Sequence, residues 1–580
     1  MDRFPLAAIL CFVVFTSQES KSVVADGSAS QPYRTAYHFQ PLKNWMNDPN
    51  GPVYYKGVYH LFYQHNPDAA TWRTQIAWGH SISHDLINWV HLDHALHPSE
   101  SYDINGCWSG SITLLPGDVP AMFYTGVDSQ GRQVQNLATP KNSSDPYLVE
   151  WVKSPHNPVM IPPSGVGESL YRDPTSAWRG PDGVWRVLVG AEKNGNGVAF
   201  MYKSSDFVNW SLTESPLHSS ENTAMWECPD FYPVEENGEY GVETSVQGNG
   251  LKHVLKVSFD SQEAYILGKY VGETDEFVSE SNMVGGGLDL RHDNGKFYAS
   301  KSFYDPARKR RVLWGWVNES DSDEDSCRRG WAGLQSFPRS ILLSKTGKQL
   351  VQWPIDEIEK LRSEAVSFHG EELHGGSLLE VSGITASQAD VEVSFKIPNL
   401  EDVEALDPSW INPQVICSSR DASVQGRYGP FGLLVFASES LTEQTAVFFR
   451  IFRKNLDSLV VVMCSDQSRS SLRGGIDKTT FGAFLDIDLR HESISLRTLI
   501  DHSIVESFGG NGLACITARV YPTLAIDEAA HLYAFNNGTR AVEISRLEAW
   551  SMKKARLAPV THSDEGLSST ASTAAAWLMT

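Results

Sequence analysis

Short runs of alternating apolar and polar residues, separated by glycine, proline and asparagine, fill the chain from about residue 45 to residue 345. Alternation with a period of two predicts β-strands, and helical periodicity is nearly absent here. Comparable strands begin mostly a little over 60 residues apart, near Tyr59, Ala121, Trp185, His253 and Phe297. Four-stranded units repeating at this spacing predict a β-propeller with five blades.

A weak internal repeat supports the propeller. Asp48 and Asp173 each precede a proline and stand at a similar distance before a Gly-Val-aromatic turn and a strand. The phrase at 85–89 recurs in similar form at 206–210, and the two repeats are offset by 125 and 121 residues. A β-sandwich would not place the same turn at the same point of each unit. Equivalent positions in a propeller lie at equivalent radii, so the two carboxylates are expected to converge on the axial funnel.

The pattern changes beyond the propeller. Apolar residues at Ile355, Ile358 and Leu361 predict a short helix, and the clean alternation of Val391–Phe395 predicts an antiparallel sandwich. We therefore expect an all-β protein with a five-bladed β-propeller over 33–352, a linking helix over 353–366, a C-terminal β-sandwich over 367–555 and a disordered tail over 556–580.

Composition and charge narrow the classes of partner. The chain has 580 residues and a net charge of −22, which argues against nucleic acid or an anionic membrane as a partner. The apolar run Leu6–Phe15 is too short to span a bilayer, and small residues follow it up to Ala25. We interpret residues 1–25 as a secretory signal peptide rather than a buried strand. The protein is expected to be secreted or vacuolar.

Cysteines and glycosylation sequons agree with secretion. The seven cysteines are too few for a disulfide scaffold, and no Cys-x-x-Cys pair suggests zinc. One disulfide is expected between Cys417 and Cys464, because both lie in the strand-rich C-terminal part. No phosphate loop or zinc motif is present and the acidic run at 321–325 lacks the EF-hand spacing, so neither a metal nor a cofactor is expected. Some sequons arise by chance, and the four in this chain stand at Asn142, Asn209, Asn318 and Asn537.

Three acidic residues are candidates for catalysis. Asp48 and Asp173 lie in the repeated turns, and Glu227 lies between a tryptophan and a cysteine. Each could belong to an ordinary surface turn, but three acids at one funnel predict glycoside hydrolysis. A retaining glycosidase uses one carboxylate as nucleophile and a second carboxyl as acid and base. Apolar walls against sugar faces are expected from three tryptophans, each of which core packing would also explain: Trp45, Trp72 and Trp108.

Sequence motifs then identify a resemblance. They are WMNDPNG at 45–51, FYQHNP at 62–67, CWSGS at 107–111, YRDP at 171–174, WECPD at 226–230 and LRTLIDHSIVESF at 496–508. From about Tyr33 to Met552, the chain resembles plant acid invertases and fructan exohydrolases of glycoside hydrolase family 32. The resemblance implies a propeller joined to a sandwich. It also implies that Asp48 is the nucleophile, Asp173 the transition-state stabiliser and Glu227 the acid/base. Because Glu227 must be protonated while Asp48 is ionised, we expect an acid pH optimum.

The resemblance also assigns the substrate site. Positions that hold the fructosyl unit match Asn47, Gln64, Trp72, Ser109 and Arg172. Sucrose-active members tend to carry an Asp and a Lys in a turn on the glucosyl side, which Asp293 and Lys296 match. Because Arg73 replaces a common glycine, a fructan exohydrolase stays the alternative to an invertase.

Partners and location follow from the same likeness. The partners it implies are a small or oligosaccharide substrate, sucrose or a fructan, and a proteinaceous inhibitor, and we expect a monomer. Pro229 is typical of the cell-wall branch, which places the protein in the apoplast, with the vacuole as the other option. A non-catalytic carbohydrate-binding protein is the alternative from another functional class.

Overall fold

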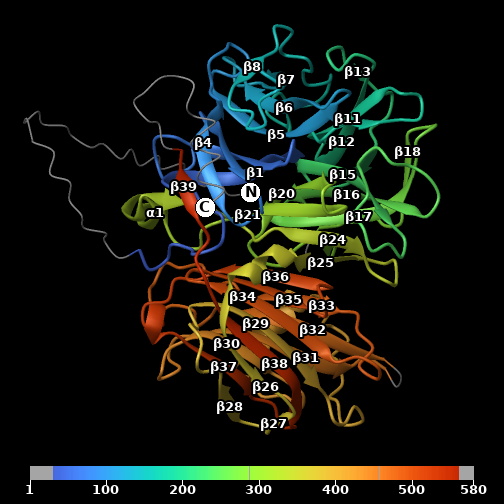
Figure 1. Cartoon of the computed structure of the whole chain (residues 1–580). Coiled ribbons are helices and arrows are strands. Elements are labelled where there is room, and N and C mark those ends of the chain that lie inside the picture. The colour runs from blue at the N-terminus through green and yellow to red at the C-terminus, as the bar shows by residue number, and fades with distance from the viewer. Residues whose placement is uncertain (1–30, 286–287, 456–457, 561–580) are drawn as a thin grey trace, which may run out of the picture. The chain divides into compact units, whose positions relative to one another are not determined.

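The computed structural model describes residues 31–285, 288–455 and 458–560. Strands in these residues form seven sheets, five in the N-terminal part and two in the C-terminal part (Figure 1). The predicted all-β class is therefore confirmed. The predicted signal peptide lies outside the described residues. Within the described part, no helix is long and apolar enough to cross a membrane.

Blade one is antiparallel apart from its two outermost pairings, and blade two is antiparallel throughout. Blade one contains β22 (Trp331–Ala332), β1 (Asn44–Tyr55), β2 (Val58–Asn66), β3 (Ala77–Ser83), β4 (Trp89–Leu96) and β39 (Leu557–Pro559). Blade two contains β5 (Gly106–Leu115), β6 (Val119–Val127), β7 (Gln133–Pro140) and β8 (Trp151–Lys153).

Three further sheets complete the predicted five blades. Blade three contains β9 (Tyr171–Arg172), β10 (Trp178–Arg179), β11 (Trp185–Lys193), β12 (Asn196–Ser204), β13 (Ser211–Leu212) and β14 (His218–Ser220). Blade four contains β15 (Glu227–Glu235), β16 (Leu251–Phe259), β17 (Gln262–Val271), β18 (Glu276–Ser279) and β19 (Leu290–Arg291). Blade five contains β20 (Tyr298–Asp305), β21 (Arg310–Val317), β23 (Leu334–Gln335), β24 (Arg339–Leu343) and β25 (Leu350–Pro354).

Two short strands from later in the chain complete the first blade. The short strand β22, which follows blade five's second strand, pairs in parallel with β1. The strand β39 returns from the C-terminal domain and pairs in parallel with β4. The expected disordered tail over 556–580 is therefore wrong at Leu557–Pro559, where backbone pairing with β4 orders the chain, and 561–580 lie outside the described residues.

The internal repeat seen in the sequence is a repeated turn. In blade one, Asp85 Oδ1 accepts from the backbone N–H of Asn88 at 2.8 Å, and in blade three Asp206 Oδ1 accepts from Asn209 N–H at 2.8 Å. Each asparagine side chain donates to the other carboxylate oxygen, at 2.8 Å in both turns. The aspartates therefore replace backbone partners that a tight turn leaves unpaired.

The segment between the domains is shorter than predicted. A 3-10 helix, η1, spans Asp356–Leu361, and the strand β26 (Arg362–Phe368) follows at once. The linking helix expected over 353–366 is therefore wrong at both ends, because 353–354 belong to β25 and 362–366 belong to β26. The strand β26 pairs with the long strand β38 (Val542–Met552), and this sheet pairing overrides the weak helical pattern.

Two antiparallel sheets form the predicted β-sandwich. One contains β26, β27 (Glu371–Leu373), β29 (Gln388–Lys396), β34 (Ile494–Asp501), β35 (Ile504–Gly509), β36 (Ala514–Arg519) and β38. The other contains β28 (Ser377–Glu380), β30 (Phe431–Ala437), β31 (Thr445–Arg453), β32 (Leu459–Asp466), β33 (Phe481–Leu485) and β37 (His531–Asn536). The helices of the described residues are short: α1 (Asp323–Arg329), α2 (Pro413–Ser419), η1 and η2 (Asp527–Ala529). Inward-facing residues such as Val391, Phe431 and Val447 form the core between the sheets.

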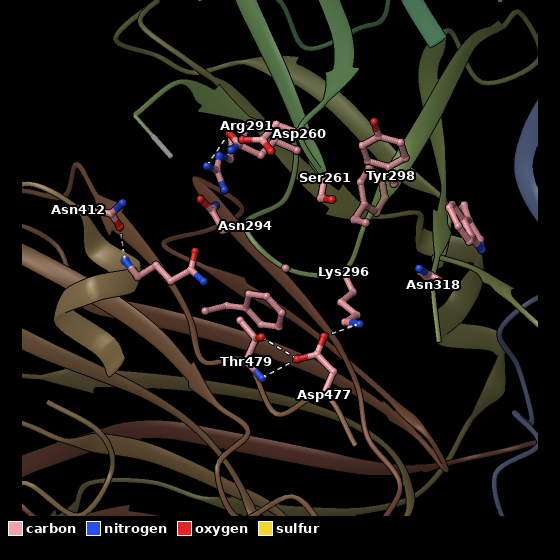
Figure 2. A pocket seen from close by; sticks show the side chains of 16 residues that line it. Asp260, Ser261, Arg291, Asn294, Lys296, Tyr298, Asn318, Asn412, Asp477 and Thr479 are labelled. Atoms are coloured by element: carbon pink, nitrogen blue, oxygen red, sulfur yellow. Dashed lines mark hydrogen bonds and ion pairs between the residues drawn. The ribbon is translucent and has the colours of Figure 1, made fainter. Parts of the chain in front are cut away.

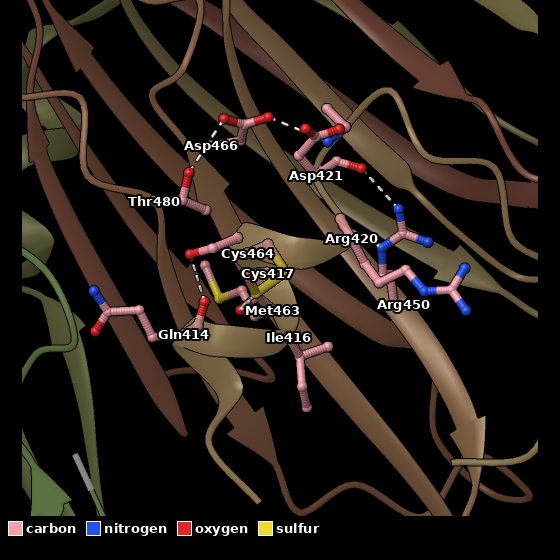
Figure 3. The surroundings of a disulfide bond; sticks show 12 residues. Gln414, Ile416, Cys417, Arg420, Asp421, Arg450, Met463, Cys464, Asp466 and Thr480 are labelled. Carbon is pink, nitrogen blue, oxygen red and sulfur yellow. Dashed lines mark hydrogen bonds between the residues drawn. A yellow bond between two sulfur atoms is a disulfide. The ribbon is translucent and has the colours of Figure 1, made fainter. Parts of the chain in front are cut away.

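The predicted disulfide is present in the sandwich. Cys417 on α2 and Cys464 on β32 are joined, with their Cα atoms 5.5 Å apart (Figure 3). The bond fixes α2 against the outer face of the second sheet, where both cysteines are fully buried. Asn412 starts α2, and its side chain accepts from the N–H of Gln414 at 2.9 Å, as expected of an N-cap.

A buried charge network connects the two domains. His38 lies 2.9 Å from Asp501 and 3.1 Å from Glu506, both on sandwich strands. Glu506 also pairs at 2.7 Å with Arg339 of blade five, which pairs at 2.9 Å with Asp293. All five side chains are fully buried, so each charge depends on its partners for stabilisation.

Candidate active site

The innermost strands of four blades are bulged where they carry the candidate residues. Register shifts lie at Asp48 in β1, at Ser109 in β5, just after Glu227 in β15 and just after Tyr298 in β20. A bulge adds one residue to one strand and turns its side chain out of the usual alternation. The bulges therefore point these polar side chains into a common funnel. In regular strands the same side chains would point elsewhere.

These side chains surround a cavity of about 510 Å³. It is lined by Asn47, Asp48, Gln64, Trp72, Ile76, Trp108, Ser109, Gln133, Ser169, Arg172, Asp173, Glu227, Cys228, Tyr298 and Trp316. All three candidate acids lie in this set, although they come from three different blades. Six of the other predicted site residues line it too, and Trp45, Asp293 and Lys296 do not.

Asp48 is held by two neighbouring donors. Ser109 Oγ donates to its Oδ2 at 2.6 Å, and Asn47 Nδ2 donates to its Oδ1 at 3.0 Å. Burial and the nearby charge of Asp173 raise the pKa of Asp48 to about 6, and the two donors oppose that rise. The fixed, hydrogen-bonded carboxylate is suited to act as a nucleophile once it is ionised.

Asp173 and Cys228 meet beside Asp48. The backbone N–H of Cys228 donates to Asp173 Oδ2 at 2.9 Å, and its thiol lies 3.4 Å from the same oxygen and 3.5 Å from Asp48 Oδ2. Burial raises the pKa of Asp173, which the guanidinium of Arg172 opposes. Burial and both carboxylates raise the pKa of the Cys228 thiol well above its usual range. The thiol therefore stays protonated and donates weakly to the two acids.

Glu227 is clamped by two side chains. Arg172 Nη2 lies 2.5 Å from Glu227 Oε1, and Tyr298 Oη donates to Oε2 at 2.5 Å. The guanidinium of Arg172 also lies 3.8 Å from Asp173, so it bridges two of the three acids. Such contacts fix the orientation of a carboxyl that exchanges a proton with substrate.

The tryptophans have different positions. Trp72 is 52% exposed and meets Trp108 edge-on, so both rings can contact a ligand. Trp45 is buried, and its indole N–H donates to Asn47 Oδ1 at 2.9 Å. The expectation that Trp45 walls the cavity is therefore wrong, because it supports Asn47 from behind. Gln64 donates to the Cys107 carbonyl at 3.1 Å within the lining.

Asp293 and Lys296 lie apart from the three acids. Asp293 is fully buried and bonds Arg339 and Thr517 in the domain interface, so it has no free oxygen toward a substrate. Lys296 Nζ pairs with Asp477 at 2.7 Å, as Figure 2 shows, and lines a second cavity of about 580 Å³. The two cavities share Tyr298 and Trp316 as lining residues.

Sequence reasoning missed several lining residues. Tyr298 and Trp316 belong to blade five, and Gln133, whose Oε1 accepts from Arg172 at 3.1 Å, belongs to blade two. Only the motif position beside Lys296 could have drawn attention to Tyr298. Among the residues that the structure describes, no group of three or more His, Cys, Asp or Glu is placed to hold a metal ion.

Comparisons with known proteins agree with this geometry. Two family models match, one described as the glycosyl hydrolases family 32 N-terminal domain over residues 38–354 and one as the family's C-terminal domain over 357–551. The fructan 6-exohydrolase of Beta vulgaris is 56% identical, over 91% of this chain and 88% of that protein. The β-fructofuranosidase insoluble isoenzyme CWINV3 of Arabidopsis thaliana is also 56% identical, over 91% of each chain.

A solved structure is similarly close. The crystal structure of fructan 1-exohydrolase IIa from Cichorium intybus has a TM-score of 0.90 and 55% identity, and covers 92% of this chain and 99% of that one. A substituted form of the same chicory enzyme is solved in complex with 1-kestose, with the same score and coverage.

Proposed function

The chain belongs to glycosyl hydrolase family 32, and on that premise we propose that this glycoside hydrolase is a retaining β-fructofuranosidase. The observation that carries the proposal is the meeting of Asp48, Asp173 and Glu227 around one cavity. Three carboxyls with separate hydrogen-bond partners provide the nucleophile, stabiliser and proton donor that the reaction needs. Because these acids are all present in the cavity, a non-catalytic carbohydrate-binding role is less well supported.

The reaction proceeds in two steps. Asp48 attacks the anomeric carbon of a terminal fructosyl unit while Glu227 gives its proton to the leaving oxygen. Glu227 then takes a proton from water, which attacks the same carbon and releases fructose and Asp48. Asp173 stabilises the positive charge that develops on the sugar in both steps. Asp48 and Asp173 must both be ionised, so on the acid side of the pH–rate profile the rate falls as the pH drops through the raised pKa of Asp48, about 6, and through the raised pKa of Asp173.

We take sucrose as the principal substrate. A cavity of about 510 Å³ is of the size that encloses small ligands, and the Trp72 and Trp108 rings offer apolar faces to its sugars. Relatives named β-fructofuranosidase support this choice. The Asp293 and Lys296 pair no longer supports it, because their side chains are committed to protein partners.

Fructan is the second candidate substrate, and one observation favours it. The neighbouring cavity of about 580 Å³ shares Tyr298 and Trp316 with the first, which leaves room for sugar units beyond a disaccharide. Initial rates of fructose release from sucrose, inulin and levan, measured at equal concentrations of terminal fructosyl groups, separate the candidates. A higher rate on either polymer than on sucrose would reverse the proposed preference, and no release from any of the three would contradict the proposed function.

Secretion to the cell wall is also part of the proposal. Relatives are named cell-wall or insoluble isoenzymes, and the vacuole stays the alternative. Asn142, Asn209 and Asn318 are exposed, but the side-chain amides of Asn209 and Asn537 donate within the fold, so we propose Asn142 and Asn318 as the glycan acceptors. Monomeric state and binding of a proteinaceous inhibitor stay predictions. Mass measurement after enzymatic deglycosylation tests the two sites.

A further inference from the structure

Two of the catalytic turns have an unfavourable backbone conformation. Asp173 has φ of 66° and Cys228 has φ of 45°, in the left-handed region that residues other than glycine rarely adopt. Such conformations persist only where the surrounding structure holds them. The two turns carry the stabiliser and the acid/base, so whatever holds them also sets catalytic geometry.

A buried lysine connects these two turns. The ammonium of Lys301 donates to the carbonyl of Pro229 at 3.0 Å and to that of Pro174 at 3.4 Å. These carbonyls belong to the residues immediately after Cys228 and Asp173. Lys301 is only 2% exposed, which is unusual for a charged side chain and costly unless its bonds compensate.

The bulge in β20 is what gives Lys301 this position. Tyr298 and Lys301 are three residues apart, and in a regular strand an odd separation places two side chains on opposite faces. A register shift lies between them, and Ala299 inside it has φ of 54°. The added residue restores both side chains to one face. One strand therefore delivers a donor to Glu227 and a donor to the two turns.

We propose that Lys301 is a positioning residue, which joins the Asp173 and Glu227 turns through the carbonyls of Pro174 and Pro229 and so fixes the two acids relative to each other. The inference rests on the proposed function, because it concerns the geometry of that reaction. Lys301 lies behind the turns and does not line the substrate cavity, so its effect is exerted through the acids.

The charges around Lys301 give it a second effect. The groups that face it are Asp173, Cys228, Asp230 and Lys256. Lys256 donates to the Cys228 carbonyl at 2.8 Å and so supports the same turn. Burial raises the pKa of Asp173, and the positive charge of Lys301 opposes that rise. Loss of the charge therefore raises the pH below which Asp173 is protonated and stops stabilising the transition state.

The test is Lys301→Met, assayed for kcat and KM on sucrose and inulin and for the pH dependence of kcat/KM. We expect kcat to fall about 100-fold with little change in KM, since small displacements of catalytic groups have effects of this size. The acid limb should also move to higher pH. Lys252→Met is the matched control, because Lys252 also donates to a backbone carbonyl, that of Gly347 at 2.8 Å, away from the acids.

Two further variants keep the test decisive. Lys301→Arg retains the charge and should recover part of kcat and the wild-type acid limb. Lys301→Gln replaces the methionine variant if that one does not fold. Wild-type kcat and acid limb in a folded, neutral variant, with only a lower thermal midpoint, would overturn the inference. Failure of the proposed function is a different result, namely no fructose release by the wild-type protein.

Discussion

Removing the Ser109 hydroxyl should shift the pH dependence of the enzyme by a predictable amount. Ser109 Oγ donates to Asp48 Oδ2 at 2.6 Å, and this bond lowers the pKa of a carboxyl that burial raises to about 6. A hydrogen bond to a charged group contributes about 1.5–3 kcal/mol. At about 1.4 kcal/mol per pKa unit, Ser109→Ala should raise the Asp48 pKa by about 1–2 units.

The sign of the effect follows from the role of Asp48. The nucleophile acts only when ionised, so activity is lost as the pH falls through its pKa. A higher pKa moves this acid limb upward, and well below the limb kcat/KM should fall about 10- to 100-fold relative to wild type. Any contact of Ser109 with substrate lowers activity equally at all pH values and leaves the position of the limb unchanged.

The assay is the initial rate of fructose release from sucrose across pH. Ser545→Ala is the control, because Ser545 also donates to a neutral backbone carbonyl, that of Ser394 at 3.0 Å, on a sandwich strand away from the three acids. Its acid limb should coincide with wild type. An unmoved limb in Ser109→Ala, or an equal shift in both variants, would refute the assignment of Asp48 as the titrating nucleophile.

Three other predictions follow from the fold and the cavity. Arg339→Met leaves the buried carboxylates of Asp293 and Glu506 without their partner. It should lower the free energy of unfolding, measured in urea, by about 3–5 kcal/mol. A loss under about 1 kcal/mol would show that the network does not stabilise the fold. Cys464→Ser removes a disulfide between residues 47 positions apart and should lower the free energy of unfolding by about 2–5 kcal/mol. A reductant should lower the stability of the wild-type protein to the same level and leave that of the variant unchanged. Trp72→Ala should raise KM about tenfold, equivalent to about 1.4 kcal/mol, without lowering the thermal midpoint, because the ring is 52% exposed; an unchanged KM would exclude it from the sugar site.

The repeat spacing was enough to predict the propeller, but it did not show which strand of each blade the repeated position marks. Strands near Tyr59, Ala121 and His253 each follow the first long strand of their blade, and the strand near Trp185, β11, follows the short strands β9 and β10 that both pair with it. The strand near Phe297 is instead the first strand of blade five. The alternation of apolar and polar residues indicates which residues form strands, but it does not indicate where a strand lies within its sheet.

The site residues that lie in recognisable sequence motifs were predictable, and those outside such motifs were not. Asp48, Asp173 and Glu227 lie in distinctive turns, and the structure brings them to one cavity. Asp293 could not be placed from sequence, because its burial depends on Arg339 and on a sandwich strand that follows more than 200 residues later. Lys301 has no motif of its own, since its contacts depend on a bulge that pairing with β21 reveals.

The pairing of Glu227 with Asp48 as acid/base and nucleophile is tested most directly by Glu227→Gln. The amide is close in size to the carboxyl and can still accept from Arg172 or Tyr298, so the thermal midpoint should stay near that of wild type. Because an amide cannot donate the proton that a carboxylic acid gives to the leaving oxygen, the rate of fructose release from sucrose should fall about 10²- to 10⁴-fold. A folded Glu227→Gln protein that releases fructose at the wild-type rate would show that the three acids do not perform the reaction described here.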